Sequence, residues 1–194
     1  MNSNTELINY LKTGGYITSK RVEEAFRQVD RSKFVPEKHK ESPYKDLPLS
    51  IAENATISAP HMVAVNTELL EVKPGNTVLE IGSGSGYQAA VLGELAEKVV
   101  GIEVNPELVE ESRKRLQETE NVEIIEGSDL KPVKTVFERI LYSVATESIE
   151  KSKQYLKEDG VIVAPIKQNG YQTLTSYRDG ETSEHGRVRF VEMV

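Results

Sequence analysis

The feature that most constrains this chain is a short apolar segment followed by three glycines at alternate positions. Residues 77–81 are mostly apolar and include β-branched side chains, which is typical of a buried strand. Gly82, Gly84 and Gly86 follow, and a helical pattern begins at Tyr87. A strand, a glycine turn and a helix in this order form the first unit of an open α/β sheet, whose ligands bind at the carboxyl ends of the strands. Glycine suits such a turn because a side chain would keep the ligand away from the backbone.

Two acidic residues near this turn narrow the class of ligand. A phosphate-binding P-loop needs Gly-Lys-Ser/Thr, which is absent, and Tyr87 stands where a dinucleotide motif has its third glycine. Glu80 would repel a pyrophosphate but attract an ammonium group. Glu103 ends the next apolar run, where a carboxylate can accept hydrogen bonds from both ribose hydroxyls. A ligand with a ribose, an amino group and no phosphate indicates S-adenosylmethionine; the alternative is a glycine turn without a ligand.

The composition of the 194 residues excludes several other classes. The net charge is −7 and no long basic block occurs, so binding to nucleic acid is not expected. No apolar run is long enough to span a membrane, and the first residues do not resemble a signal peptide, so the cytoplasm is the expected location. The absence of cysteine excludes disulfides, thiolate metal sites and a cysteine nucleophile. The three histidines show no metal-ligand spacing, so no metal site is expected.

The pattern of the chain predicts one domain over residues 1–194, with residues 1–54 as a helical and loop extension packed on it. The expected fold is a Rossmann-like, doubly wound α/β sheet, mostly parallel, that closes with an antiparallel pair of C-terminal strands. Helices are expected at residues 5–11, 19–29, 58–71, 87–95 and 149–156, and another begins at Asn105. Strands are expected at residues 77–81, 99–104, 122–125, 137–143, 161–165, 172–177 and 188–194. Residues 37–54 are predicted to form a long loop.

The start of the helix predicted at residues 58–71 is a candidate anion site. Ser58 is a suitable N-cap, and proline at position 60 is tolerated in a first turn. Free N–H groups and the helix dipole favour a carboxylate there. The alternative is that Ser58 only caps the helix and binds no anion. The inner face of this helix is expected to contain Met62, Val65, Leu69 and Leu70. Ser128 or Asp129, after the third predicted strand, is a candidate partner of an adenine amino group; a plain polar turn is the alternative.

Several stretches give the chain a resemblance to a known family. They are residues 34–36 (Phe-Val-Pro) and 44–46 (Tyr-Lys-Asp), 56–62 (Thr-Ile-Ser-Ala-Pro-His-Met), 78–92 around the glycine turn, and 188–191 (Val-Arg-Phe-Val). In this order they resemble the protein-L-isoaspartate (D-aspartate) O-methyltransferase family, from about residue 34 to the C-terminus. Residues 56–62 are the specific signal, because many methyltransferases share the glycine motif.

The resemblance implies methyl transfer from S-adenosylmethionine to the carboxylate of L-isoaspartyl (and D-aspartyl) residues in damaged proteins, a repair reaction that yields S-adenosylhomocysteine. Isoaspartyl peptides and proteins would be the partners. The resemblance places the active-site serine at Ser58. It places the substrate loop at Thr56, Ile57, Ala59, Pro60 and His61. It places the cofactor-binding residues at Glu80, Gly82, Ser83, Gly84, Ser85, Gly86, Glu103, Val104, Ser128 and Asp129.

The chemistry of this reaction suits the residues, because a carboxylate with a pKa of roughly 4 is already a nucleophile at neutral pH and needs no strong base. The chain departs from the family at Gly127-Ser128-Asp129, where the family has Gly-Asp-Gly, and at Ala55, where it commonly has glutamine. Residues 130–136 and the region after Pro165 are shortened. Two alternatives follow: a related methyltransferase acting on a small molecule or RNA, and a family member without catalytic activity.

Overall fold

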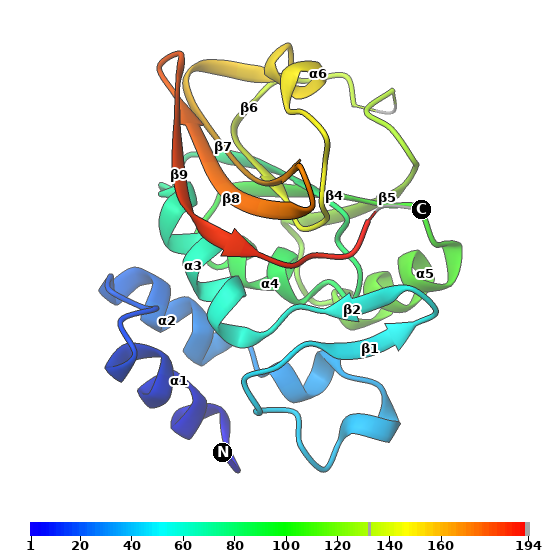
Figure 1. The fold of residues 1–194 in the computed structure, drawn as a ribbon. Coiled ribbons are helices and arrows are strands. Elements are labelled where there is room, and N and C mark those ends of the chain that lie inside the picture. The colour runs from blue at the N-terminus through cyan, green and yellow to red at the C-terminus, as the bar shows by residue number, and fades with distance from the viewer. Residues whose placement is uncertain (132, 193–194) are drawn as a thin grey trace.

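The computed structural model describes residues 1–131 and 133–192, and its centre is a twisted sheet of seven strands (Figure 1). The strand order is β5-β4-β3-β6-β7-β8-β9. Strands β3 to β7 pair in parallel, whereas β8 and β9 continue the sheet in antiparallel pairing. The strands are β3 (Thr77–Ile81), β4 (Lys98–Glu103), β5 (Val122–Glu126), β6 (Phe137–Tyr142), β7 (Leu156–Gln168), β8 (Tyr171–Arg178) and β9 (Glu181–Val188). The predicted α/β fold class is confirmed.

The longer helices contribute to the core on one face of the sheet, and one short helix borders the core on the other face. They are α1 (Asn4–Thr13), α2 (Lys20–Gln28), α3 (Pro60–Leu70), α4 (Tyr87–Gly93), α5 (Pro106–Arg115) and the short α6 (Glu150–Lys153), with 3-10 turns η1 (Arg31–Phe34) and η2 (Glu37–His39). The predicted starts of two helices are confirmed, because Ser19 caps α2 by accepting a hydrogen bond from the Val22 N–H and Asn105 caps α5 by accepting one from the Glu107 N–H. In the described part of the chain, every helix is too short or too polar to traverse a bilayer.

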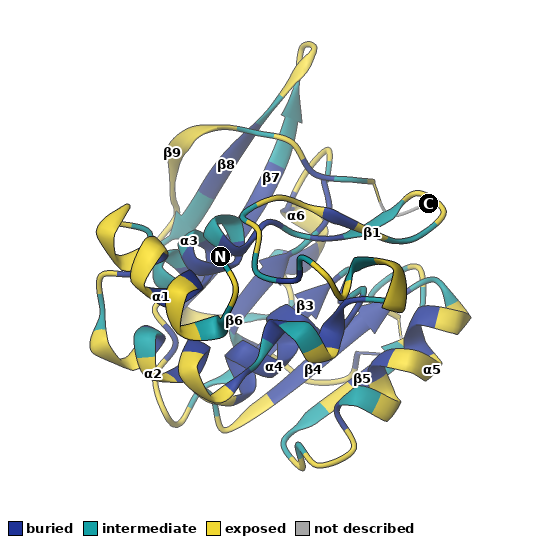
Figure 2. Ribbon diagram, turned by 90° about the horizontal axis from the view of Figure 1, so that it is seen from below, coloured by how far each residue is buried: buried dark blue, intermediate teal, exposed yellow. Residues whose placement is uncertain are grey.

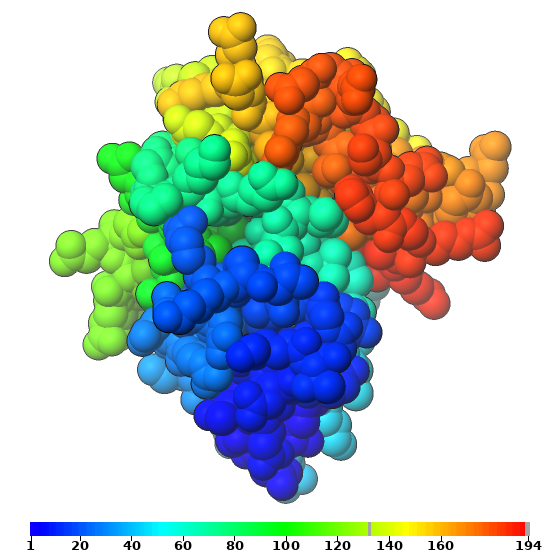
Figure 3. All heavy atoms as spheres, turned by 90° about the vertical axis from the view of Figure 1, so that its left-hand side faces the viewer, coloured from blue at the N-terminus to red at the C-terminus, as the bar shows by residue number. Residues whose placement is uncertain are grey.

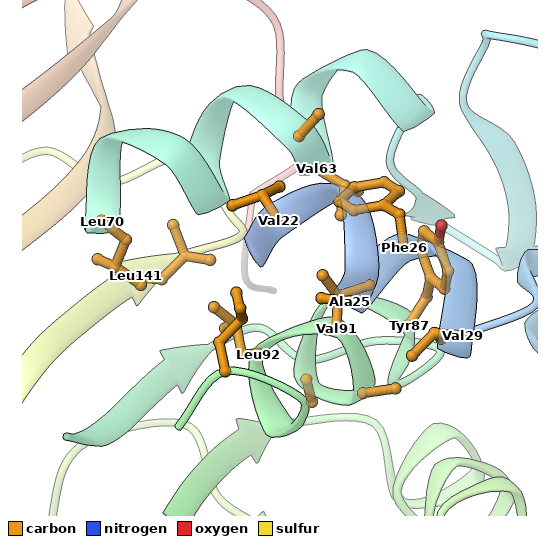
Figure 4. Packing of buried hydrophobic residues seen from close by; sticks show 14 of the residues in the cluster. Val22, Ala25, Phe26, Val29, Val63, Leu70, Tyr87, Val91, Leu92 and Leu141 are labelled. Carbon is orange, nitrogen blue, oxygen red and sulfur yellow. The ribbon is translucent and has the colours of Figure 1, made fainter. Parts of the chain in front are cut away.

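The core on the side of α2, α3 and α4 is one apolar cluster, whose residues come from positions between Leu7 and Leu174 in the sequence. Figure 4 shows part of this cluster. Phe26 on α2 and Tyr87 on α4 meet edge to face there, with ring centroids 6.3 Å apart. Fully burying a side chain such as Phe26 stabilises the fold by roughly 1.5–3 kcal/mol. A second cluster, which includes Ile102 and Ile140, lies on the other face of the sheet. Residues 1–54 therefore share the core of the sheet and do not form a separate one.

The segment predicted as a loop, residues 37–54, contains regular structure. Strand β1 (Leu49–Ala52) pairs antiparallel with β2 (Ala55–Ile57) in a small hairpin outside the main sheet, and Asn54 turns it with φ 59°. The loop prediction was wrong for β1. This strand has four residues and only one buried side chain, so its sequence shows no alternation of apolar and polar residues.

Two other boundaries differ from the prediction near the C-terminus. The helix predicted at residues 149–156 is only α6, and Leu156 already belongs to β7. The last strand is β9 rather than residues 188–194, of which 193–194 lie outside the described residues. Asp179 and Gly180 both have positive φ and connect β8 directly to β9, as in a tight hairpin turn. β9 is polar and almost wholly exposed (Figure 2), so it carries no hydrophobic pattern that would reveal a strand.

The orientation of α3 also differs from the prediction. Of the four residues expected on its inner face, only Leu70 is buried, while Met62, Val65 and Leu69 are half-buried. The buried residues of α3 are Pro60, Val63, Ala64, Asn66, Thr67 and Leu70. Apolar residues occur around most of this helix, so its periodicity alone does not select the face that meets the sheet.

Candidate active site

A cavity of about 300 Å³ lies at the carboxyl ends of the central strands. β3 is flanked there by β4 and β6, so the connections leave in opposite directions and open a crevice between them. Figure 1 shows the β1–β2 hairpin and the end of the chain approaching this edge. The lining residues are Gly82 and Gly84 after β3, Glu103, Val104 and Asn105 after β4, Ser143 and Val144 after β6, Glu53–Thr56 of the hairpin, and Val191 and Glu192 of the tail.

The glycines after β3 are required for two different reasons. Gly82 has φ 82°, and a Cβ on it would lie 2.4 Å from Val144 Cγ1. Gly86 has φ 83°, and its missing Cβ faces Ser112 on α5 and Leu116 just after this helix rather than the cavity. Gly82 therefore shapes the cavity wall, whereas Gly86 permits close packing of α5 against the turn.

Glu103 is held in place by backbone donors. One carboxylate oxygen accepts hydrogen bonds from the N–H groups of Val104 and Asn105, both at 2.9 Å, and the other accepts from the Gly84 N–H at 2.8 Å. These bonds fix the carboxylate at the cavity wall without using all of its lone pairs. The remaining acceptor capacity suits a ligand with two neighbouring hydroxyl groups.

Glu80 lies behind the cavity and is fully buried. The Ser143 hydroxyl, which lines the cavity, donates to Glu80 Oε1 at 2.6 Å, while the buried Oε2 has no partner among the described residues. Burial raises the pKa of Glu80 to about 8. An unpartnered buried carboxylate oxygen beside the cavity fits a ligand that brings a cationic donor such as an ammonium group.

Ser128 and Asp129 lie apart from Glu103. They line a neighbouring cavity of about 370 Å³ together with Tyr142 and Tyr155. Asp129 pairs with the Lys131 ammonium at 2.8 Å and accepts the Lys131 N–H, which lowers the pKa of this exposed carboxyl. The carboxylate of Asp129 is therefore already engaged with a neighbour on its own loop.

Ser58 lies between β2 and α3, and the structure corrects its predicted role as a cap. The N-cap of α3 is Ala59, whose side chain makes no capping hydrogen bond. Because Pro60 has no N–H, the first donor is the His61 N–H, and Asp46 Oδ1 accepts it at 2.9 Å. The carboxylate expected at this helix start is thus supplied by the chain itself. Ser58 is half-buried, and among its neighbours in sequence Ala55 and Thr56 reach the cavity.

The sequence model of the protein-L-isoaspartate(D-aspartate) O-methyltransferase family matches residues 2–194. The chain belongs to this family. It is 40% identical to the protein-L-isoaspartate O-methyltransferase of Methanopyrus kandleri over 202 residues, covering 97% of this chain and 89% of the relative. It is also 40% identical to the enzyme of that name from Staphylothermus marinus, covering 100% of this chain and 94% of the relative.

A solved structure of an isoaspartate methyltransferase has the same fold as this chain over its whole length. It is a Plasmodium falciparum chain named as a protein-L-isoaspartate O-methyltransferase, in complex with S-adenosyl-L-homocysteine. The TM-score is 0.88 at 26% sequence identity, and the match covers 100% of this chain and 99% of that one. The resemblance predicted from the motifs is confirmed.

The methyltransferase fold brings together only part of the predicted residue set. Gly82, Gly84, Glu103, Val104 and Thr56 share the first cavity. The remainder do not line it. Glu80, Ser83, Ser85, Ile57, Ala59 and Pro60 are buried, Ser58 and His61 are half-buried, Gly86 packs against α5, and Ser128 and Asp129 line the second cavity.

Sequence reasoning missed several residues that line the first cavity. Ser143 and Val144 follow β6, so the rule applied to the other strand ends would have found them. Val191 and Glu192 had no such signal, because they reach the cavity through tertiary contacts of the tail. The Ala145 N–H, for example, donates to the Val191 carbonyl at 2.8 Å.

Proposed function

We propose that this chain methylates the carboxylate of L-isoaspartyl (and D-aspartyl) residues in damaged proteins, with S-adenosylmethionine as methyl donor. The observation that carries this proposal is that Thr56 of the β1–β2 hairpin and Glu103 after β4 line one cavity. Family membership over residues 2–194 supports the same reaction. Damaged proteins with isoaspartyl residues are the proposed partners, and the cytoplasm is the proposed location.

On the cofactor side, Glu103 is proposed to accept the ribose hydroxyls, and Glu80 with Ser143 to stabilise the ammonium group. Gly82 and Gly84 leave room for the ligand, and Ser83, Ser85 and Gly86 shape the turn beneath it. Val104 would contact the adenosine moiety from the wall of the cavity. Ser128 and Asp129 are proposed to act at the adenine end, through the neighbouring cavity.

On the substrate side, Ser58 is proposed to hold the isoaspartyl carboxylate as the catalytic residue. Thr56, Ile57, Ala59, Pro60 and His61 would form the loop around it. When bound, S-adenosylmethionine supplies an electrophilic methyl group that a carboxylate oxygen attacks while the bonding electron pair leaves with sulfur. The protein contributes no base, because the substrate carboxyl is ionised at neutral pH. Alignment of the two reactants by the hairpin and the glycine turn can contribute about 7–11 kcal/mol.

A methyl-transfer assay with radiolabelled S-adenosylmethionine tests the proposal. An isoaspartyl peptide and its normal aspartyl isomer are compared, and calorimetry with S-adenosylhomocysteine measures cofactor binding separately. We expect label only in the isoaspartyl peptide. If neither peptide is labelled but S-adenosylhomocysteine binds, the chain acts on another substrate. If no peptide is labelled and S-adenosylhomocysteine does not bind, the chain is not catalytic.

A further inference from the structure

Asp46 connects three parts of the molecule that are distant in sequence. Its Oδ1 accepts the His61 N–H at 2.9 Å and contacts His61 Nδ1 at 2.8 Å. Its Oδ2 accepts the Tyr10 hydroxyl of α1 at 3.1 Å. Because an ionised carboxylate only accepts hydrogen bonds, Nδ1 carries the imidazole proton in this pair.

Asp46 and His61 lie on either side of the β1–β2 hairpin in the sequence. Asp46 precedes β1 and His61 follows β2, so their contact closes the base of the β1–β2 hairpin. The segment between them contains Ser58 and the residues at positions 53–56 that line the cavity. The hairpin pairs with no strand of the main sheet, so its orientation over the cavity depends on contacts such as this one.

Tyr10 on α1 and Tyr16 just after this helix support the pair from outside. The Tyr16 ring lies 5.3 Å from the His61 ring, and the Tyr10 and Tyr16 rings are 6.4 Å apart. The side chain of Asp46 is 12% exposed and that of His61 is 32% exposed, so water screens the pair only partly. In Figure 3 the N-terminal residues, in blue, form a lobe directly against the cyan and green part of the chain.

We propose that Asp46 and His61 form a clasp that fixes the β1–β2 hairpin over the cavity, and that Asp46 is a positioning residue for methyl transfer. It acts by placing Ser58 and Thr56 rather than by touching the reactants. The N-terminal extension thereby contributes to the rate through Tyr10, although none of its helices lines the cavity.

The chain offers a matched control for Asp46. Asp30 also accepts one backbone N–H, from Ser32 at 2.9 Å, and one tyrosine hydroxyl, from Tyr44 at 2.9 Å. It belongs to the same N-terminal region but lies outside the hairpin that the clasp closes. Asp30→Ala should therefore lower stability like Asp46→Ala without misplacing the hairpin.

The test compares Asp46→Ala, Asp46→Asn and Asp30→Ala by methyl-transfer kinetics, thermal melting and hydrogen exchange of residues 47–59. Asp46→Ala should lower kcat/KM for the isoaspartyl peptide by about 10- to 100-fold, since misplacement by about 1 Å can cost that much. The Kd of S-adenosylhomocysteine should change much less, and exchange in the hairpin should accelerate. Asp46→Asn keeps an acceptor for the His61 N–H and should recover part of the rate, while Asp30→Ala should retain kcat/KM and the slow hairpin exchange.

The clasp is overturned if Asp46→Ala and Asp30→Ala lower kcat/KM equally, in proportion to their loss in Tm, or if hairpin exchange is unchanged in Asp46→Ala. Since the kinetic part rests on the proposed function, failure of that function would appear as a wild-type protein that does not label the peptide. Hydrogen exchange of the wild-type protein and Asp46→Ala would then still decide whether the clasp fixes the hairpin.

Discussion

The two sides of the active-site cavity are built in opposite ways. The cofactor side consists of the turns after β3 and β4, which are close in sequence and tied together by backbone hydrogen bonds to Glu103. The side proposed to bind the substrate is the β1–β2 hairpin, and Val191 and Glu192, from near the C-terminus, line the same cavity. The first side continues directly from two strands of the sheet, and the second depends on long-range contacts. Substitutions should therefore separate cofactor binding from methyl transfer.

The largest effect is expected from Gly82→Ala on the cofactor side. A left-handed backbone costs a non-glycine residue roughly 1–2 kcal/mol, and the new methyl group would also overlap Val144, adding about 1–3 kcal/mol. Gly170→Ala is the control, because Gly170 has φ 87° with nothing near its missing Cβ. Chemical denaturation should show a clearly larger loss for Gly82→Ala; equal losses would mean that the close approach to Val144 is unimportant.

The next effect concerns Glu103. Glu103→Ala removes the proposed ribose acceptor and leaves the N–H groups of Gly84, Val104 and Asn105 without their partner. Each hydrogen bond to a charged group is worth about 1.5–3 kcal/mol, so losing the bonds to both ribose hydroxyls should weaken binding of S-adenosylhomocysteine, measured by calorimetry, by at least about 100-fold. Glu103→Gln keeps one acceptor oxygen and should bind better than Glu103→Ala. Unchanged binding in Glu103→Ala would assign the cofactor to another cavity.

Glu80 is expected to make the stability of the protein depend on pH. Its pKa of about 8 in the folded protein is above the ordinary value of about 4.5, because burial disfavours the charged form. The folded state therefore holds this proton more tightly, and the stabilisation is complete below pH 4.5 and is lost as the pH rises through 8. Between pH 5.5 and 8.5, the Tm of the ligand-free protein should fall more steeply than that of Glu80→Gln. If the Tm values of the two proteins fell equally with pH, Glu80 would not be the buried carboxyl without a charged partner that the structure shows.

The same contrast explains how much the sequence could predict. The turns after β3 and β4 could be predicted, because a buried strand, its glycine turn and the acid at the next strand end are local patterns. Of the residues predicted there, Gly82, Gly84 and Glu103 line the cavity. Ser58 was wrongly predicted to cap α3, because the first N–H of that helix, on His61, is bound by Asp46, which lies fifteen positions before His61. The polar strand β9 and the cavity lining by Val191 were missed for a similar reason. Both depend on neighbours supplied only by the folded chain.

The most direct test of this account is Ser58→Ala, measured by peptide methylation and by calorimetry on the same preparation. Ser58 is proposed to hold the substrate carboxylate, so kcat/KM for the isoaspartyl peptide should fall by about 10- to 100-fold, as for loss of a hydrogen bond to a charged group. The Kd of S-adenosylhomocysteine should stay within about twofold, because the turns after β3 and β4 remain intact. A variant that methylates the peptide at the wild-type rate, or one that loses cofactor binding in proportion to activity, would contradict the division of the site into two independent sides.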